Sequence, residues 1–175
     1  TDACGNAITV TQLITVDDTT DPVLAGVPAD VTAECSAVPA PATPTASDNC
    51  DTNVAITFAE VHTDGTCPDR YTLTRTWTAT DDCGNTDTGV QVITVVDTTP
   101  PTASNPAAVT VECIGDVPAT DISVVTDEAD NCSTPVVAWV SDSPAGTCPT
   151  VITRIYSVTD ACGNAITVTQ LITVD

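Results

Sequence analysis

The chain has 175 residues, and 24 acidic residues against three arginines give it a formal net charge of -21. Such a surface repels the phosphates of nucleic acids and of anionic membranes, so no nucleic-acid partner and no membrane insertion are expected. Aromatic residues make up 3% of the chain, which suits two small cores better than one large core.

The segment that opens the chain recurs at its other end. Thr1–Asp17 reads TDACGNAITVTQLITVD, and Thr159–Asp175 is identical. A shorter copy, TDDCGN, lies at Thr80–Asn85, and the cysteines of the three copies are evenly spaced along the chain. Such periodicity indicates tandem modules. We expect residues 1–17 (the tail) to be the C-terminal hairpin tail of a preceding module, followed by module A (residues 18–96) and module B (residues 97–175).

Each module repeats the same four segments in the same order. Module A carries ADVTAEC, ASDNC, DGTCP and LTRTWTATD, and module B carries AAVTVEC, EADNC, AGTCP and ITRIYSVTD. Regular cysteine spacing without a CxxC pair argues against a zinc or thioredoxin-like site and indicates disulfides in an oxidising compartment. The cysteines are Cys35, Cys50, Cys67 and Cys83 in module A, and Cys113, Cys132, Cys148 and Cys162 in module B.

The run before the second TDxCGN copy has a period of two. Tyr71, Leu73, Trp77 and Ala79 alternate with threonines, which predicts a strand with one apolar face. The Gly84-Asn85 turn and the following run GVQVITVVD predict a hairpin. No helical periodicity of useful length is present, so short strands between turn signals indicate an all-β sandwich.

The motifs ATDDCGN, VTDACGN, DNC and the module-end VDTTPP together resemble the hyalin-repeat (HYR) family, and more closely its four-cysteine bacterial relatives. The resemblance covers almost the whole chain, although the joint before module A reads DTTDP instead of DTTPP. It implies tandem immunoglobulin-like β-sandwich modules, each with two disulfides. It also implies a secreted or surface-anchored protein with an adhesive or structural role.

The implied immunoglobulin-like topology leads to an expected disulfide pairing. In module A, the strand-end cysteines Cys35 and Cys67 would lie at the bottom, and the loop cysteines Cys50 and Cys83 at the top. We call the first pair the lower cysteines and the second pair the upper cysteines. In module B, the lower cysteines are Cys113 and Cys148, and the upper cysteines are Cys132 and Cys162. Although four cysteines allow three pairings, we expect Cys35–Cys67, Cys50–Cys83, Cys113–Cys148 and Cys132–Cys162.

The same topology gathers acidic and amide side chains at the top of each module. Ca2+ takes about six to eight oxygen ligands, so these residues are candidates for a structural Ca2+ site that stiffens the joints. Alternatively, Asp and Asn serve only as loop residues that bond the local backbone. The candidate ligands are Asp17, Asp18, Asp21, Asp48, Asn49, Asp51, Asp81 and Asp82 around module A, and Asp97, Asp130 and Asp160 in module B.

Two joint threonines are candidate modification sites. Asp-Thr-Thr at both joints resembles a short O-glycan acceptor motif of some bacteria, with Thr19 and Thr98 as acceptors. No nucleophile–base pair or phosphate loop is present, and one histidine without any lysine leaves little for acid–base chemistry. We therefore expect neither an enzyme nor a catalytic cofactor.

The leading hypothesis for function is structural. The chain would be a tandem-repeat segment of an extracellular bacterial fibre or surface stalk, stiffened by disulfides and by Ca2+, with neighbouring identical repeats or subunits as its partners. One alternative is an adhesin repeat that binds a surface glycan or protein through its loops. Another is a filament subunit that assembles by donating the tail as a strand to its neighbour.

Overall fold

The computed structural model describes residues 1–147 and 149–175, which form ten β-strands and three short 3-10 turns. None of the helical turns in these residues has the length and hydropathy of a membrane-spanning helix. The chain forms two compact units. Unit 1 comprises Thr1–Val27, Thr43–Phe58 and Trp77–Gly89, and unit 2 comprises Pro28–Ala42, Ala59–Thr76 and Val90–Asp175. Unit 2 therefore takes in all of module B and the part of module A that carries the lower cysteines.

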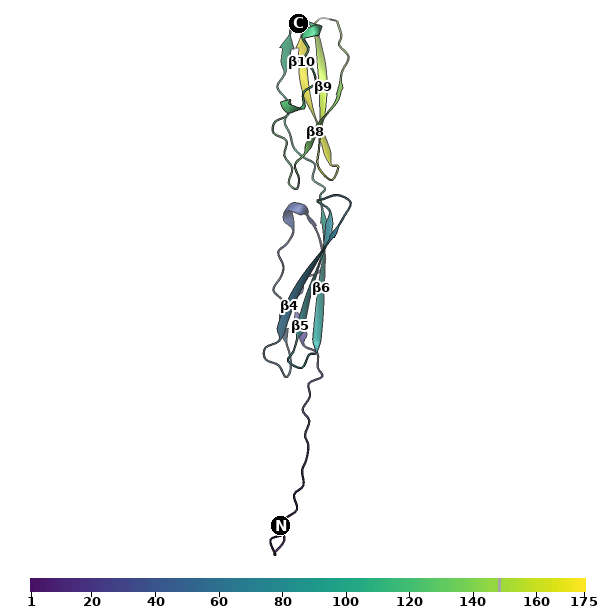
Figure 1. Cartoon of the computed structure of the whole chain (residues 1–175). Coiled ribbons are helices and arrows are strands. Elements are labelled where there is room, and N and C mark those ends of the chain that lie inside the picture. The colour runs from purple at the N-terminus through teal and green to yellow at the C-terminus, as the bar shows by residue number, and fades with distance from the viewer. Residues whose placement is uncertain (148) are drawn as a thin grey trace. The chain divides into compact units, whose positions relative to one another are not determined.

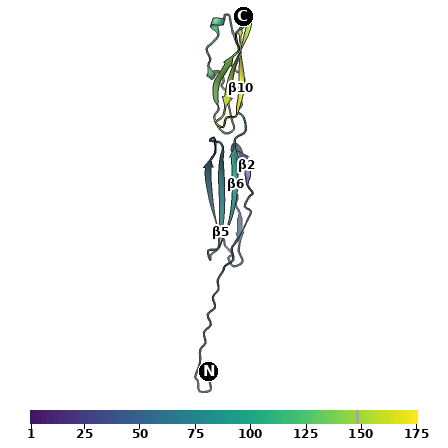
Figure 2. The same ribbon diagram turned by 90° about the vertical axis from the view of Figure 1, so that its right-hand side faces the viewer.

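Module A contains a four-stranded sheet and a two-stranded sheet. The larger sheet has the order β2-β6-β5-β4, with strands Val31–Glu34, Thr86–Val96, Tyr71–Thr80 and Ala55–Asp64. The first of these strands, β2, lies parallel to the last strand of the module, β6 (Figure 2). The smaller sheet pairs β1 (Val23–Ala25) with β3 (Thr45–Ser47), and the turn η1 (Cys35–Ala37) follows β2.

Module B repeats the larger sheet, and its described residues show an isolated bridge between Thr102 and Ala129 in place of the smaller one. Its sheet has the order β7-β10-β9-β8, with strands Val109–Val111, Ala165–Val174, Thr150–Thr159 and Val136–Asp142. Strand β10 pairs antiparallel with β9 and parallel with β7, and β8, β9 and β10 lie together in Figure 1. The turns η2 and η3 span Ile114–Asp116 and Ile122–Val124. The expected all-β fold is confirmed in both modules.

Strand β5 has the alternation that its sequence predicts. Leu73, Trp77 and Ala79 are buried, whereas the threonines between them are only half-buried. In unit 2, Leu73 packs with Ile93 and Val95 of β6. Burial of each such aliphatic side chain stabilises a fold by roughly 1.5–3 kcal/mol. The three side chains on these two strands form a small core, and together they make a substantial contribution to the stability of the sheet.

The tail shows that sequence alone does not make a strand here. Residues 1–17 form no strand (Figure 1), whereas the identical residues 159–175 end β9 and form β10. Ile172 is fully buried in β10, and its counterpart Ile14 is 72% exposed. Strand formation depends on neighbouring strands that bury one face, and β9 and β7 supply them for β10.

Candidate functional site

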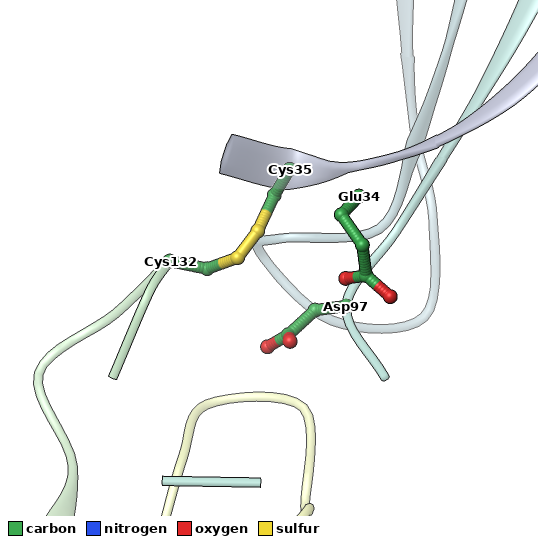
Figure 3. Close-up of side chains that lie close together, drawn as sticks. All are labelled: Glu34, Cys35, Asp97 and Cys132. Atoms are coloured by element: carbon green, nitrogen blue, oxygen red, sulfur yellow. A yellow bond between two sulfur atoms is a disulfide. The ribbon is translucent and has the colours of Figure 1, made fainter. Parts of the chain in front are cut away.

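Two disulfides join module A to module B within unit 2. Cys35 in η1 bonds Cys132 in the DNC loop, and Cys67 before β5 bonds Cys162 in the turn between β9 and β10. Their Cα atoms are 5.9 Å and 5.2 Å apart, an ordinary spacing for disulfides. Figure 3 shows the first of these bonds beside the carboxylates of Glu34 and Asp97.

This pairing corrects the sequence-based expectation of bonds within each module. The lower cysteines of module A bond the upper cysteines of module B, in place of Cys35–Cys67 and Cys132–Cys162. The expectation treated each module as closed, but at this joint the loops of the next module lie within disulfide distance.

The other two expected pairs have different outcomes. Cys50 and Cys83 are exposed, and among the described residues neither forms a disulfide, so the expected bond between them is absent. The expected pair Cys113–Cys148 includes Cys148, which lies outside the described residues.

An acidic cluster lies at the same joint. Carboxylate oxygens of Asp97, Asp130 and Asp160 lie within 4.8 Å of one another. Asp97 is fully buried, and within the described residues neither of its carboxylate oxygens has a hydrogen-bond partner. Burial raises the pKa of Asp97, and the charges of Asp160 and Asp130 raise it further. A buried carboxylate without a partner is costly, so this cluster calls for a positive charge.

The DNC loop presents Asp130 to the cluster. One carboxylate oxygen of Asp130 accepts hydrogen bonds from the backbone N–H groups of Cys132 at 2.9 Å and Ser133 at 3.0 Å, whereas its Oδ2 is buried with no partner among the described residues. Burial acts to raise the pKa of Asp130, but these hydrogen bonds lower it below its ordinary value. The residue therefore serves as a turn residue and also directs an ionised oxygen into the cluster.

The hairpin turn holds Asp160 in a similar way. Its Oδ1 accepts from the backbone N–H of Asn164 at 2.9 Å, and its Oδ2 accepts from the Asn164 side-chain amide at 2.7 Å. The same amide nitrogen donates to the backbone carbonyl of Asp97 at 3.3 Å. Asn164 thus fixes the turn against the start of module B and brings the carboxylates of Asp97 and Asp160 together.

Module A contributes two acids that the sequence analysis missed. A Glu34 oxygen lies within 4.8 Å of one from Asp97, and Asp69 lies equally close to Asp97. The Glu34 carboxylate accepts hydrogen bonds from the backbone N–H and the hydroxyl of Thr98. Glu34 and Asp69 flank the lower cysteines Cys35 and Cys67 in sequence, and this adjacency is the signal that could have identified them.

The acids predicted around module A form a related but more open group in unit 1. Oxygens of Asp18 and Asp48 lie within 4.8 Å of each other and of the Cys50 sulfur. Oδ2 of Asp48 is buried without a partner among the described residues, and so is Oδ2 of Asp130, the counterpart of Asp48 in module B. Hydrogen bonds from the backbone N–H groups of Asp51 and Cys50 lower the pKa of Asp48.

The remaining predicted residues around module A do not gather in one cluster. Asp51 accepts a hydrogen bond from the backbone N–H of Asp82 at 3.1 Å, and both line one open pocket with Asp17 and Asp18. Asp21 and Asn49 line a separate pocket. Asp81 accepts from the side-chain amide of Asn85 at 2.7 Å. Thr19 and Thr98 are both exposed.

The chemistry of the joint suits a hard cation. The nearby sulfurs are in disulfides, so the available ligands are carboxylate oxygens, which Ca2+ prefers. Asp97 and Asp130 provide three buried oxygens that are unpaired among the described residues. The residues of the joint therefore fit Ca2+.

Two solved structures show a low similarity to this chain. A crystal structure of Drosophila N-cadherin EC1-4 aligns with 89% of this chain and 50% of that chain, at 12% identity and a TM-score of 0.39. A crystal structure of protocadherin gamma C5 EC1-3 aligns with 89% of this chain and 68% of its own, at 14% identity and a TM-score of 0.34. This chain thus spans about half the length of the N-cadherin chain that it matches. A search of curated proteins found no significant match.

The family comparison agrees with the repeats seen in the strands and the cysteines. Residues 23–95 and 101–174 each match the model of a family described as the HYR-like domain with 4 cysteines. The two matches cover most of the chain, and each contains a four-stranded sheet of the same order. The chain therefore belongs to the family of HYR-like domains with four cysteines and carries two of these domains in tandem.

Proposed function

We propose that this chain is a non-enzymatic structural segment of an extracellular fibre or surface stalk, in which each module is fixed to the next. The observation that carries the proposal is the pair of disulfides Cys35–Cys132 and Cys67–Cys162, which join one module to the other. Disulfides form and persist in oxidising compartments outside the cytosol. Bonds between modules serve the mechanical continuity of a repeat array.

Two bonds at one joint restrict motion more than one bond would. A single disulfide leaves rotation about the link, whereas two bonds at separate points oppose both bending and twisting of the joint. Cys35 and Cys132 are separated by 97 residues, and closing a loop of that length stabilises a fold by about 4.7 kcal/mol in the chain-entropy model. The joint therefore adds stability to modules whose cores are small.

Labelling of intact cells tests this function. Antibodies raised against the chain should label extracellular fibres or stalks, and these structures should lose integrity when reductant and a metal chelator are added together. Labelling confined to the cell interior would contradict the proposal.

Ca2+ at the joint is the second part of the proposal. The buried charge of Asp97, flanked by Asp130 and Asp160, opposes folding of the joint when no cation is bound. A ligand that binds only the folded state stabilises it by about 2.7 kcal/mol at 100 times its dissociation constant. We expect the melting temperature of the metal-stripped chain to rise when Ca2+ is added.

The variant Asp97→Asn tests the ion site specifically. It should raise the melting temperature in chelator, because it removes the buried charge, and it should abolish the response to Ca2+. Asp116→Asn is the matched control, because Asp116 is an exposed acid in η2 and its loss should leave the response intact. An Asp97→Asn variant that responds to Ca2+ as strongly as the unmodified chain would rule out Asp97 as a ligand.

Assembly by strand donation is a second candidate, favoured by the tail. Its residues are identical to those of β10 but expose the side chains that β10 buries. The tail would then complete the sheet of a neighbouring subunit. Native material analysed under denaturing and reducing conditions separates the cases: subunits of one size support donation, and a giant chain supports a covalent array.

A further inference from the structure

We propose that Cys50 and Cys83 form inter-module disulfides with the lower cysteines of another copy of module B, Cys113 and Cys148. The inference rests on the proposed structural role and extends it. It makes the top of module A a docking surface for the bottom of another copy of module B. Every joint of the array would then carry two disulfides.

The first support is that the upper cysteines sit in the same local framework in both modules. The backbone N–H of Cys50 donates to Asp48 at 2.8 Å, and that of Cys132 donates to Asp130 at 2.9 Å. Both cysteines follow an Asp-Asn pair in a DNC motif. The DNC loop of module A is therefore shaped like the loop that already holds an inter-module bond in module B.

The hairpin turns match in the same way. The backbone N–H of Cys83 donates to Asp81 at 2.9 Å, and that of Cys162 donates to Asp160 at 2.8 Å. The turn in module A is also fixed to its entry segment, because Asn85 donates to the carbonyl of Asp18 at 3.1 Å. Both loops of the docking surface are thus in place before any partner arrives.

The second support is the exposure of these two cysteines. Cys50 and Cys83 are exposed and line one open pocket together with Asp18, Asp51 and Asp82. Both thiols are therefore accessible to the cysteines of another module.

The third support identifies the partner. The tail, which directly precedes module A, is identical in sequence to the C-terminal end of module B, so another copy of module B is the partner that matches the segment next to the docking surface. Glu112-Cys113 at the end of β7 repeats Glu34-Cys35 at the end of β2, and Cys113 is exposed. Cys148 lies outside the described residues and is assigned by its sequence position alone.

The two ends of the repeat are therefore complementary but different. Contact between different surfaces on identical units is heterologous, and when it does not close on itself it produces an open filament. Each bond forms when two thiols are oxidised by an external disulfide. The cysteines lose two electrons and two protons, and the oxidant is reduced to two thiols, which balances the reaction.

Peptide mapping of the natively secreted protein without reduction tests this proposal. Free thiols are blocked at acidic pH, and the denatured chain is cleaved on the N-terminal side of aspartate. The distribution of aspartates places all nine cysteines on separate peptides. We expect cross-linked peptides that join Cys50 to Cys113 and Cys83 to Cys148. The peptide that joins Cys35 to Cys132 serves as the internal control.

The outcomes separate this inference from the proposed function. A Cys50–Cys83 bond, or both residues recovered as blocked thiols, would overturn the inference while the Cys35–Cys132 peptide still supports the structural role. Recovery of Cys35–Cys67 and Cys132–Cys162 peptides would overturn both.

Discussion

Each of the two larger sheets buries one arginine in a row of apolar side chains. Arg75 and Arg154 are both 3% exposed. Arg154 donates to the carboxylate of Asp142 at 2.8 Å and to the carbonyl of Pro118 at 3.0 Å. A buried guanidinium is tolerated only when its hydrogen bonds are satisfied, so the carboxylate partner is part of the core of module B.

The Asp142–Arg154 pair predicts a pH dependence of stability. Hydrogen bonds from Arg154 hold the pKa of Asp142 below its ordinary value. A carboxyl with a lower pKa in the folded state stabilises the fold above its unfolded pKa, and that contribution is lost as the pH falls through the folded pKa. We expect the free energy of unfolding to fall below about pH 4, as measured by denaturant titration at several pH values.

Replacement of the carboxylate tests this assignment. Asp142→Asn should reduce the free energy of unfolding at neutral pH by about 2 kcal/mol, a value reduced from that of a fully buried pair because Asp142 is partly exposed. It should also flatten the acid limb of the pH profile. Asp116→Asn changes the same charge at an exposed site and should alter neither. An unchanged acid limb in Asp142→Asn would contradict the assignment.

At the scale of the element, the most informative comparison is between β10 and the tail. Ile172 packs with Ile152 and Val174 in the core of module B, whereas Ile14, in the same sequence, is exposed. Ile172→Ala should therefore cost about 2–5 kcal/mol, and Ile14→Ala should change the stability by less than about 0.5 kcal/mol. Chemical denaturation of the two variants of the whole chain measures both values.

The paired variants share the same substitution in the same local sequence. Any difference between them therefore reports the burial and strand pairing that Ile172 has in β10 and that Ile14 lacks. Equal costs would mean that the tail is packed in solution, contrary to its exposure in this structure.

The sequence predicts elements better than it predicts contacts between them. The period of two in β5 predicts its buried face, because alternation is a local property that follows from strand geometry. Cysteine pairing is not local, and a set of four cysteines gives no partner by itself. The Asp97 cluster was anticipated in part, but Glu34 and Asp69 come from the other module, so only the three-dimensional joint brings them to Asp97.

At the scale of the whole molecule, charge and covalent bonds act in opposite directions. A net charge of -21 makes neighbouring modules repel one another, and this repulsion weakens with salt. The disulfides hold the joint regardless of ionic strength, and a cation at Asp97 would neutralise the part of the charge that is buried there. In the proposed array, the acidic surface would then keep the chain soluble without separating its modules.

Cleavage of the backbone at the joint shows which bonds hold the modules together. A specific protease site inserted between the exposed residues Thr99 and Pro100 allows the linker to be cut. The chain used also carries Cys50→Ser and Cys83→Ser, so that only Cys35 and Cys67 can link module A to module B. With the pairs Cys35–Cys132 and Cys67–Cys162, the cut chain should run as one species on a denaturing gel without reductant and as two fragments with it. In the control, which adds Cys35→Ser and Cys67→Ser, the same cut should release two fragments without reductant. Bonds confined to each module would release both fragments from the chain that keeps Cys35 and Cys67 as well, because no covalent link would then cross the joint.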